Sequence, residues 1–314
     1  MKNKPENDAG KSATPRGRAA VIGLGSMGSG MALSLLRAGF DVCDCDANAA
    51  AMGRFAAQGG AIATTPAEAA KGADVVVSVV VNAAQTEAIL FGERGVAAAM
   101  PTDSVFISSA TMDPEFARGF AARLEPTGRL YLDAPVSGGA QRAAEGQLTV
   151  LASGRPEALA RARPALDAMA AKLYELGDEP GLGAAFKMVN QLLAGAHIAV
   201  ACEAITFAAK QGLDIRQVYE VITASAGNSW MFENRIPHVL DNDYAPRSAV
   251  EIFVKDLGIV QDMARSAKFP VPMAAAALQM FLMAAGSGMG RDDDASVARV
   301  YARLSGTPLP VEAR

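Results

Sequence analysis

The distribution of apolar residues divides the chain into two parts. Between residue 18 and about residue 177, short runs rich in valine and isoleucine alternate with alanine-rich stretches of helical periodicity. The short runs lack polar alternation, which is typical of strands buried on both faces. We predict strands in residues 19–23, 41–45, 74–80, 104–109, 130–136, 148–153 and 172–176, with helices between most of them. This order predicts an α/β domain with a doubly wound, mostly parallel sheet.

The pattern changes after the segment GDEPGLG at residues 177–183. From residue 184 almost to the end the periodicity is helical, and it is broken only at glycine, proline and asparagine clusters in 212–214, 227–228, 241–246, 269–270 and 286–290. The first of these helices, about 182–211, is long and rich in alanine, which suits a rod between domains or in a subunit interface. We therefore predict a polar, disordered tail (1–18), an α/β domain (19–180) and an all-α domain (181–314) begun by a long interdomain helix.

A glycine-rich turn, GLGSMG, joins the first predicted strand to the first predicted helix. The motif alone is a weak signal, but the strand, the helix and an acidic residue at the end of the second strand are all present. Gly23 permits the tight turn, Gly25 lets the backbone approach a pyrophosphate, and Gly28 lets the helix pack closely on the strand. We predict a Rossmann-type fold that binds a dinucleotide through Gly23, Leu24, Gly25, Ser26, Met27 and Gly28.

The acidic residue, Asp46, lies 21 positions after Gly25. Its carboxylate is expected to accept hydrogen bonds from the adenosine ribose and to repel a 2′-phosphate, which favours NAD over NADP. A structural glycine turn beside a solvated aspartate is the simpler alternative.

Composition narrows the classes of function. The formal charge is −4 and the basic residues are scattered, which argues against a nucleic-acid partner. No uninterrupted run of about 18 strongly apolar residues occurs, so no membrane partner is expected. Three cysteines are few for a disulfide scaffold, and a reduced cytoplasm is the expected compartment. Cys43 and Cys45 alternate along one predicted strand, which favours burial on one face over a metal site.

Few side chains are available for proton transfer, because the chain has only two histidines. Lys187 is the candidate, since Asn190 and Gln191 follow at i+3 and i+4 and share its helix face. A surface lysine near a helix start is the simpler interpretation.

The segment Ser137-Gly138-Gly139 offers consecutive backbone N–H groups to a carboxylate, or forms only a turn. For the pair Lys255-Asp256 a solvated ion pair is the usual explanation.

Four stretches together resemble the β-hydroxyacid dehydrogenase family, which includes 3-hydroxyisobutyrate dehydrogenase and tartronate semialdehyde reductase. They are GLGSMG, DAPVSGG, GLGAAFKMVNQ and FVKDLGIV, and they occur in the family's order between residue 19 and about residue 310. The resemblance implies an NAD-dependent oxidoreductase acting on a small hydroxy acid. It implies that Lys187 is catalytic, that Ser137, Gly138 and Gly139 hold the substrate carboxylate, and that Asn190 or Gln191 orients the substrate. It also implies that Lys255 and Thr111 lie on opposite flanks of the nicotinamide.

The chain departs from the family pattern at two places. The segment SSAT carries Ser108 and Ala110 where the family has an acid and a serine, so that only Thr111 matches. Residues Val80-Val81-Asn82 stand where many relatives have Leu-Pro, and Val81 and Asn82 are expected to contact the cofactor at that position.

The sequence is also compatible with two other functions, those of an imine reductase and of a non-catalytic dinucleotide-binding module. Imine reductases usually lack the lysine, and a non-catalytic dinucleotide-binding module would be expected to lose Lys187 or the Ser-Gly-Gly segment. Lys187 can accept a proton only in its neutral form, so the rate of alcohol oxidation is expected to increase at alkaline pH.

The apolar helices predict a homodimer or homotetramer, with a monomer as the alternative.

Overall fold

The computed structural model describes residues 16–310, so that residues 1–15 of the predicted tail lie outside the described residues. Its N-terminal part contains a parallel sheet with the strand order β3-β2-β1-β4-β5-β6. The strands are β1 (Arg18–Ile22), β2 (Asp41–Cys45), β3 (Ala61–Ile62), β4 (Val75–Ser78), β5 (Val105–Ser108) and β6 (Leu130–Asp133). The order reverses between β1 and β4, and in such sheets the ligand binds at the carboxyl ends of the strands beside this point.

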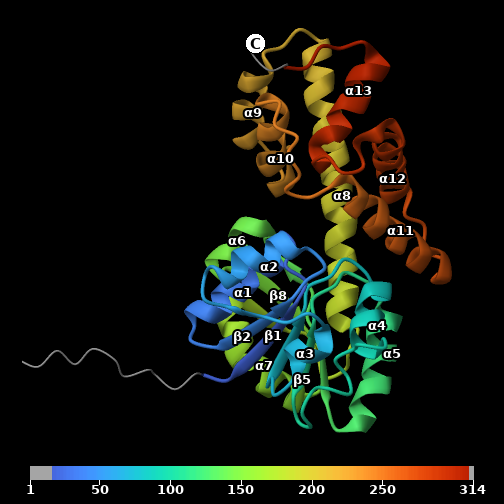
Figure 1. Ribbon diagram of the computed structural model, residues 1–314. Helices are drawn as coiled ribbons and strands as arrows, with labels where there is room; N and C mark the ends of the chain where they lie inside the picture. Colours follow the sequence, from blue (N-terminus) through green and yellow to red (C-terminus); the bar gives the residue numbers. More distant parts are fainter. Residues whose placement is uncertain (1–15, 311–314) are drawn as a thin grey trace, which may run out of the picture.

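Helices cover both faces of this sheet (Figure 1). Apolar side chains of one face, such as Val21 and Val77, pack against α1 (Gly28–Arg37), α2 (Ala49–Ala56), α6 (Gly139–Glu145) and α7 (Pro156–Met169). Those of the other face, such as Val76 and Phe106, pack against α3 (Pro66–Ala70), α4 (Ala83–Phe91) and α5 (Pro114–Leu124). Because both faces are buried, the strands have the unbroken apolar character from which they were predicted.

A second, three-stranded sheet is a difference from the prediction. It consists of β7 (Val136–Ser137), β8 (Leu148–Ala152) and β9 (Ala170–Glu175), with β7 antiparallel to β8 and β8 parallel to β9. The run 130–136, predicted as one strand, leaves the first sheet after Asp133 because Pro135 has no N–H to donate to a ladder. The strand β3 was also missed, because its two residues are exposed and too short to give a pattern.

The C-terminal part is helical. Its first helix, α8 (Leu182–Lys210), begins at the sheet domain and runs through the centre of the helical part (Figure 1). The predicted long helix of about 182–211 is confirmed as α8. The shorter helices α9 (Ile215–Thr223), α10 (Trp230–Leu240), α11 (Val250–Ser266), α12 (Pro272–Ala284) and α13 (Val297–Ser305) surround its distal part. Their core contains Ile198 and Cys202 of α8 with Leu257 of α11 and Phe281 of α12. The predicted helix breaks at 212–214, 227–228, 241–246 and 269–270 are confirmed. At 286–290 the chain instead continues α12 as a π-helical turn (Ala285–Met289), in which Gly288 alone has a non-helical conformation.

The strand β2 carries three buried side chains of unusual chemistry. Cys43 and Cys45 are buried with the residues of the α3 face, as predicted, and burial raises the pKa of both thiols. Asp44 lies between them and therefore points to the opposite face, where it is fully buried. Within residues 16–310 neither carboxylate oxygen has a hydrogen-bond partner, and burial raises the pKa of Asp44 to about 8.

Candidate active site

The glycine turn between β1 and α1 has the shape of a phosphate cradle. A Cβ atom at Gly23 would collide with the carbonyl oxygen of Val79, and one at Gly28 would collide with that of Gly23. A Cβ atom at Gly25 would meet no atom within 4 Å, so the backbone there is open to a ligand. No side chain caps the N-terminus of α1, which leaves its first N–H groups to a bound anion. The turn therefore fits the pyrophosphate of a dinucleotide.

Asp46 lies beside this turn and holds it. The N–H of Leu24 donates to Oδ2 of Asp46 at 2.5 Å, and the N–H of Asn48 donates to Oδ1 at 2.6 Å. The side chain of Leu24 is in the core, whereas Ser26 is exposed and Met27 is half-buried. The sequence predicted that Asp46 contacts the ribose. It did not predict these hydrogen bonds, through which the carboxylate orders the glycine turn.

Lys187 lies in the second turn of α8 and is 7% exposed. Within residues 16–310 its amine takes part in no ion pair. Burial lowers the pKa of Lys187 to about 8, and the charge of Lys255 lowers it in the same direction, whereas Asp256 opposes both effects. The alternative of a solvated surface lysine is therefore wrong, and much of this amine is neutral at mildly alkaline pH.

A chain of polar side chains joins α8 to α11, and its charged members, Asp256 and Lys255, act on Lys187. Asn190 Nδ2 donates to Gln191 Oε1 at 2.9 Å, and Gln191 Nε2 donates to Asp256 Oδ2 at 2.5 Å. Asp256 Oδ1 forms an ion pair with Lys255 Nζ at 2.6 Å. The structure thus brings together the predicted residues of α8 and the predicted lysine of α11.

Asp256 is fully buried, so the expectation of a solvated Lys255-Asp256 pair is wrong. Asp256 was not among the residues predicted for the site. The signal was present, because Asp256 follows Phe253 at i+3 and precedes Val260 at i+4, and both of these residues mark the buried face of α11. A carboxylate on such a face needs partners, and here Gln191 and Lys255 supply them.

Lys255 also connects the two domains. Its amine donates to the carbonyl oxygens of Val81 at 2.7 Å and of Thr111 at 3.0 Å, which follow β4 and β5. Lys255 and Thr111 are therefore in direct contact through the carbonyl oxygen of Thr111. Binding of a ring between them requires Lys255 to give up this hydrogen bond. The side chain of Asn82 accepts from the N–H of Gln85 and caps α4.

The segment Ser137-Gly138-Gly139 leads from β7 into α6. Both glycines have positive φ angles, +138° and +78°, so the turn depends on glycine. The half-buried side chain of Ser137 makes no hydrogen bond within residues 16–310, and no side chain caps α6. The turn lies four residues after Asp133, at the carboxyl end of β6.

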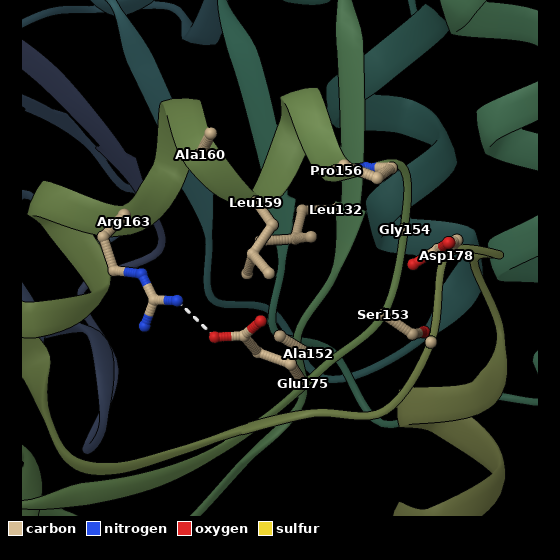
Figure 2. Close-up of a pocket in the computed structure, with 11 residues that line it drawn as sticks. Leu132, Ala152, Ser153, Gly154, Pro156, Leu159, Ala160, Arg163, Glu175 and Asp178 are labelled. Atoms are coloured by element: carbon tan, nitrogen blue, oxygen red, sulfur yellow. Dashed lines mark hydrogen bonds and ion pairs between the residues drawn. The ribbon is translucent and has the colours of Figure 1, made fainter.

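A separate pocket of about 710 Å³ lies beside α7 (Figure 2). Leu132, Ala152 and Leu159 form its apolar wall, and the ion pair between Arg163 and Glu175 lies at one end. None of the predicted site residues lines it. The pocket is therefore distinct from the candidate active site.

Comparisons with known proteins cover nearly the whole chain. The sequence model of the NAD binding domain of 6-phosphogluconate dehydrogenase matches residues 18–177. The model of the NAD-binding region of NADP-dependent 3-hydroxyisobutyrate dehydrogenase matches residues 181–301.

Individual relatives agree with these matches. The chain is 53% identical to L-threonate dehydrogenase of Cupriavidus necator, over 93% of this chain and 98% of the relative. It is 46% identical to L-threonate dehydrogenase of Escherichia coli K12, over 92% and 95%. A crystal structure of 3-hydroxyisobutyrate dehydrogenase from Salmonella typhimurium has a TM-score of 0.86 and 47% identity, over 90% of this chain and 99% of that chain. The chain belongs to the 3-hydroxyisobutyrate dehydrogenase family and is an NAD-dependent oxidoreductase that acts on the CH–OH group of a hydroxy acid.

Proposed function

We propose that this enzyme oxidises L-threonate at C2, giving 2-dehydro-L-erythronate and NADH. The identities of 46% and 53% to L-threonate dehydrogenases support the substrate. The buried lysine carries the chemistry, because an amine with a pKa of about 8 at the junction of two domains is suited to accept a hydroxyl proton. In this proposal residues 19–180 bind NAD, and residues 181–314 complete the substrate site and form subunit contacts.

The reaction removes a proton and a hydride from one CH–OH group. NAD, when bound, supplies the acceptor for the hydride that leaves C2. Neutral Lys187 accepts the proton of the C2 hydroxyl, so that the C–O bond becomes a carbonyl and the amine becomes an ammonium. In the reverse direction the ammonium returns this proton. Desolvation keeps enough of the amine neutral for the forward step.

The remaining predicted residues hold the two ligands. Ser137, Gly138 and Gly139 bind the substrate carboxylate. Gln191 uses both ends of its amide within the polar chain, so we assign the orienting contact to Asn190, whose Oδ1 accepts no hydrogen bond within residues 16–310. The cofactor contacts are assigned to Gly23, Leu24, Gly25, Ser26, Met27, Gly28, Asp46, Val81, Asn82, Thr111 and Lys255.

The activity is tested by initial rates of NADH formation with purified protein. The panel contains L-threonate, its stereoisomers, 3-hydroxyisobutyrate and glycerate. We expect the highest kcat/KM with L-threonate. A preference for 3-hydroxyisobutyrate or glycerate would assign the enzyme to 3-hydroxyisobutyrate dehydrogenase or tartronate semialdehyde reductase chemistry instead. Formation of no NADH with any of them would leave a dinucleotide-binding module without this activity.

Asp256→Asn should move the pH dependence of kcat to lower pH. The Asp256 carboxylate raises the pKa of Lys187, so its removal lets that pKa fall further below the ordinary value. Because the base works in its neutral form, the acid limb of the profile then shifts toward acid. The measurement is kcat between pH 6 and pH 10 for both proteins. An unchanged limb would show that Asp256 does not influence the base, and a limb shifted toward alkaline pH would show that Asp256 does not raise the pKa of Lys187.

Asp46→Arg should move cofactor preference from NAD toward NADP. The substitution removes the carboxylate that repels a 2′-phosphate and supplies a guanidinium that binds it. It also removes the bonds to Leu24 and Asn48, so the kcat/KM for NAD falls. The ratio of kcat/KM for the two cofactors measures the change. An unaltered ratio would mean that another residue selects the ribose.

We propose that α8 also forms the contact between subunits of a homodimer or homotetramer. Exposed apolar residues lie along this helix, namely Phe186, Val189, Leu193, Val200 and Phe207. By length and composition alone, α8 and the helical segment Pro272–Met289, which contains α12, could each span a membrane, but half of the most apolar part of α8 is buried inside the protein. A second copy is the partner that we assign to the exposed half. Sedimentation equilibrium that shows only a monomer would contradict this assignment.

We place the enzyme in the cytoplasm. The relatives above are bacterial proteins. All three cysteines of this chain are free and buried, which suits a reducing compartment.

A further inference from the structure

The first turn of α8 is held by the side chains of Asp133, the last residue of β6, and Ser153, the residue after β8. The N–H groups of Gly181 and Ala184 donate to Oδ2 of Asp133 at 3.0 and 2.8 Å. The N–H of Gly183 donates to Oγ of Ser153 at 2.9 Å, and Ser153 Oγ in turn donates to Asp133 Oδ2 at 3.2 Å. The residue at the helix start, Gly181, has no side chain to cap it. Asp133 and Ser153 therefore satisfy N–H groups that a helix leaves without partners.

This attachment is close and buried. Asp133 is 1% exposed and Ser153 is 2% exposed. A Cβ atom at Gly183 would collide with the carbonyl oxygen of Leu151 and lie 3.1 Å from Asp133 Oδ2, so only glycine allows the helix to approach this far. Backbone bonds of 3.0 and 2.8 Å also join Asp133 and Ser153 to each other. The start of α8 is thus bound to the place where β6 of the first sheet is bridged to the end of β8 of the second.

The same point connects the proton acceptor to the turn that holds the substrate. Lys187 follows Ala184 at i+3, so its side chain leaves the helix one turn above the Asp133 carboxylate. In the other direction, Asp133 is followed after three residues by Ser137 and its two glycines. A shift of α8 along or about its axis would move the amine relative to this turn.

We propose that Asp133, supported by Ser153, is a positioning residue that sets the place of Lys187 relative to the bound substrate. The proposal rests on the function proposed for Lys187. In this role Asp133 acts through α8, because it is buried and its Oδ2 accepts from the N–H groups of Gly181 and Ala184. It fixes the first turn of α8. Burial raises the pKa of Asp133 to about 6, the N–H groups of Ala184 and Gly181 oppose this shift, and the carboxylate is therefore negative above about pH 6. Because a displacement of about 1 Å costs on the order of 10²-fold in rate, a cap at this position controls turnover.

The test compares three variants with the unchanged protein. Asp133→Ala removes the acceptor, Asp133→Asn keeps one oxygen of the same shape, and Asp214→Ala removes the side-chain cap of α9, where Asp214 accepts from the N–H of Arg216 at 3.0 Å. We expect Asp133→Ala to lower kcat by about 10²-fold with an unchanged Kd for NAD. Asp133→Asn should recover most of this loss, and Asp214→Ala should keep the original kcat.

A second measurement does not depend on turnover. Carbamylation of Lys187 by cyanate, followed by peptide mass spectrometry between pH 6 and pH 11, reports the fraction of neutral amine. In Asp133→Ala the amine leaves its buried place and gains water, so its pKa should rise from about 8 toward the ordinary value. The Asp214→Ala variant should keep the original profile, since a general loss of stability does not hydrate Lys187.

The outcomes separate the two proposals. Original kcat and an original Lys187 profile in Asp133→Ala would overturn the positioning role, whatever the substrate is. Absence of activity in the unchanged protein would contradict the proposed function, whereas the cyanate profile would still test the positioning role. If Asp133→Ala does not fold, Ser153→Ala takes its place, because it removes only the bonds to Gly183 and Asp133. Ser153→Ala should then show a smaller decrease in kcat and a smaller increase in the pKa of Lys187 than those expected for Asp133→Ala.

Discussion

Lys187→Ala should lower kcat for NAD-dependent oxidation by about 10² to 10⁴, the usual contribution of a general acid or base. Lys187 is buried, and its pKa of about 8 lets it accept a proton at a pH where an ordinary lysine is charged. Alanine offers no acceptor. Since none of the groups that form the glycine turn changes, the Kd for NAD should stay the same. Initial rates and NAD titration of both proteins measure the two quantities.

The matched control is Lys210→Ala, at the other end of the same helix. Lys210 is exposed and donates to the carbonyl oxygen of Ser305, far from the candidate active site. This variant should keep the original kcat. In the unchanged enzyme kcat should rise with pH and level off above about pH 8, as Lys187 loses its proton. Normal turnover by Lys187→Ala would remove the amine from the mechanism.

Asp44→Asn should make the fold more resistant to alkaline pH. Burial raises the pKa of Asp44 to about 8, so the native state holds a proton that the unfolded chain releases near pH 4. Stability from this group is complete below about pH 4 and decreases as the pH rises toward 8. Asparagine does not ionise. Between pH 5 and pH 9 the free energy of unfolding of the variant, relative to the unchanged protein, should therefore increase by about 4 kcal/mol.

Urea unfolding at pH 5, 7 and 9 measures this difference. Asp41→Asn is the control, because Asp41 begins the same strand with an exposed side chain. Its effect should not vary in this way with pH. Parallel pH dependences for Asp44→Asn and the unchanged protein would show that Asp44 is ionised in the native state.

Activity and stability are expected to change in opposite directions as the pH rises toward 8. The base becomes active as the pH rises through about 8, and the buried carboxylate in β2 weakens the fold over the range that ends there. The pH optimum for oxidation should therefore depend on stability as well as on Lys187. In Asp44→Asn the activity at pH 9 should persist longer during incubation than in the unchanged protein.

Local features of the chain were predictable from the sequence. The alternation of apolar runs and helical stretches predicted five of the six parallel strands, and the spacing of glycines predicted a turn in which Gly23 and Gly28 admit no Cβ. The helix that carries Lys187 and Gln191 was predicted to within one residue. These properties depend on neighbouring residues and on backbone sterics, which a short stretch of sequence already contains.

Contacts between distant residues were not predictable in this way. The burial of Asp256, the hydrogen bonds from Lys255 to Val81 and Thr111, and the division of the strands into two sheets became visible only in the structure. Desolvation depends on every residue that packs around a group. The lowered pKa of Lys187 therefore could not be predicted from the residues next to it in the sequence.

Local sequence pattern alone therefore specified the two kinds of domain, the dinucleotide turn and the helix face that carries the amine. What that amine can do depends on the packing of distant residues. This packing joins Asp133 to Gly181, 48 positions away, and Lys255 to Val81, 174 positions away, and it removes water from Lys187. The physical reason is that periodicity and turn conformation are local, whereas capping by distant side chains, burial of charge and proton affinity arise only when the two domains pack together.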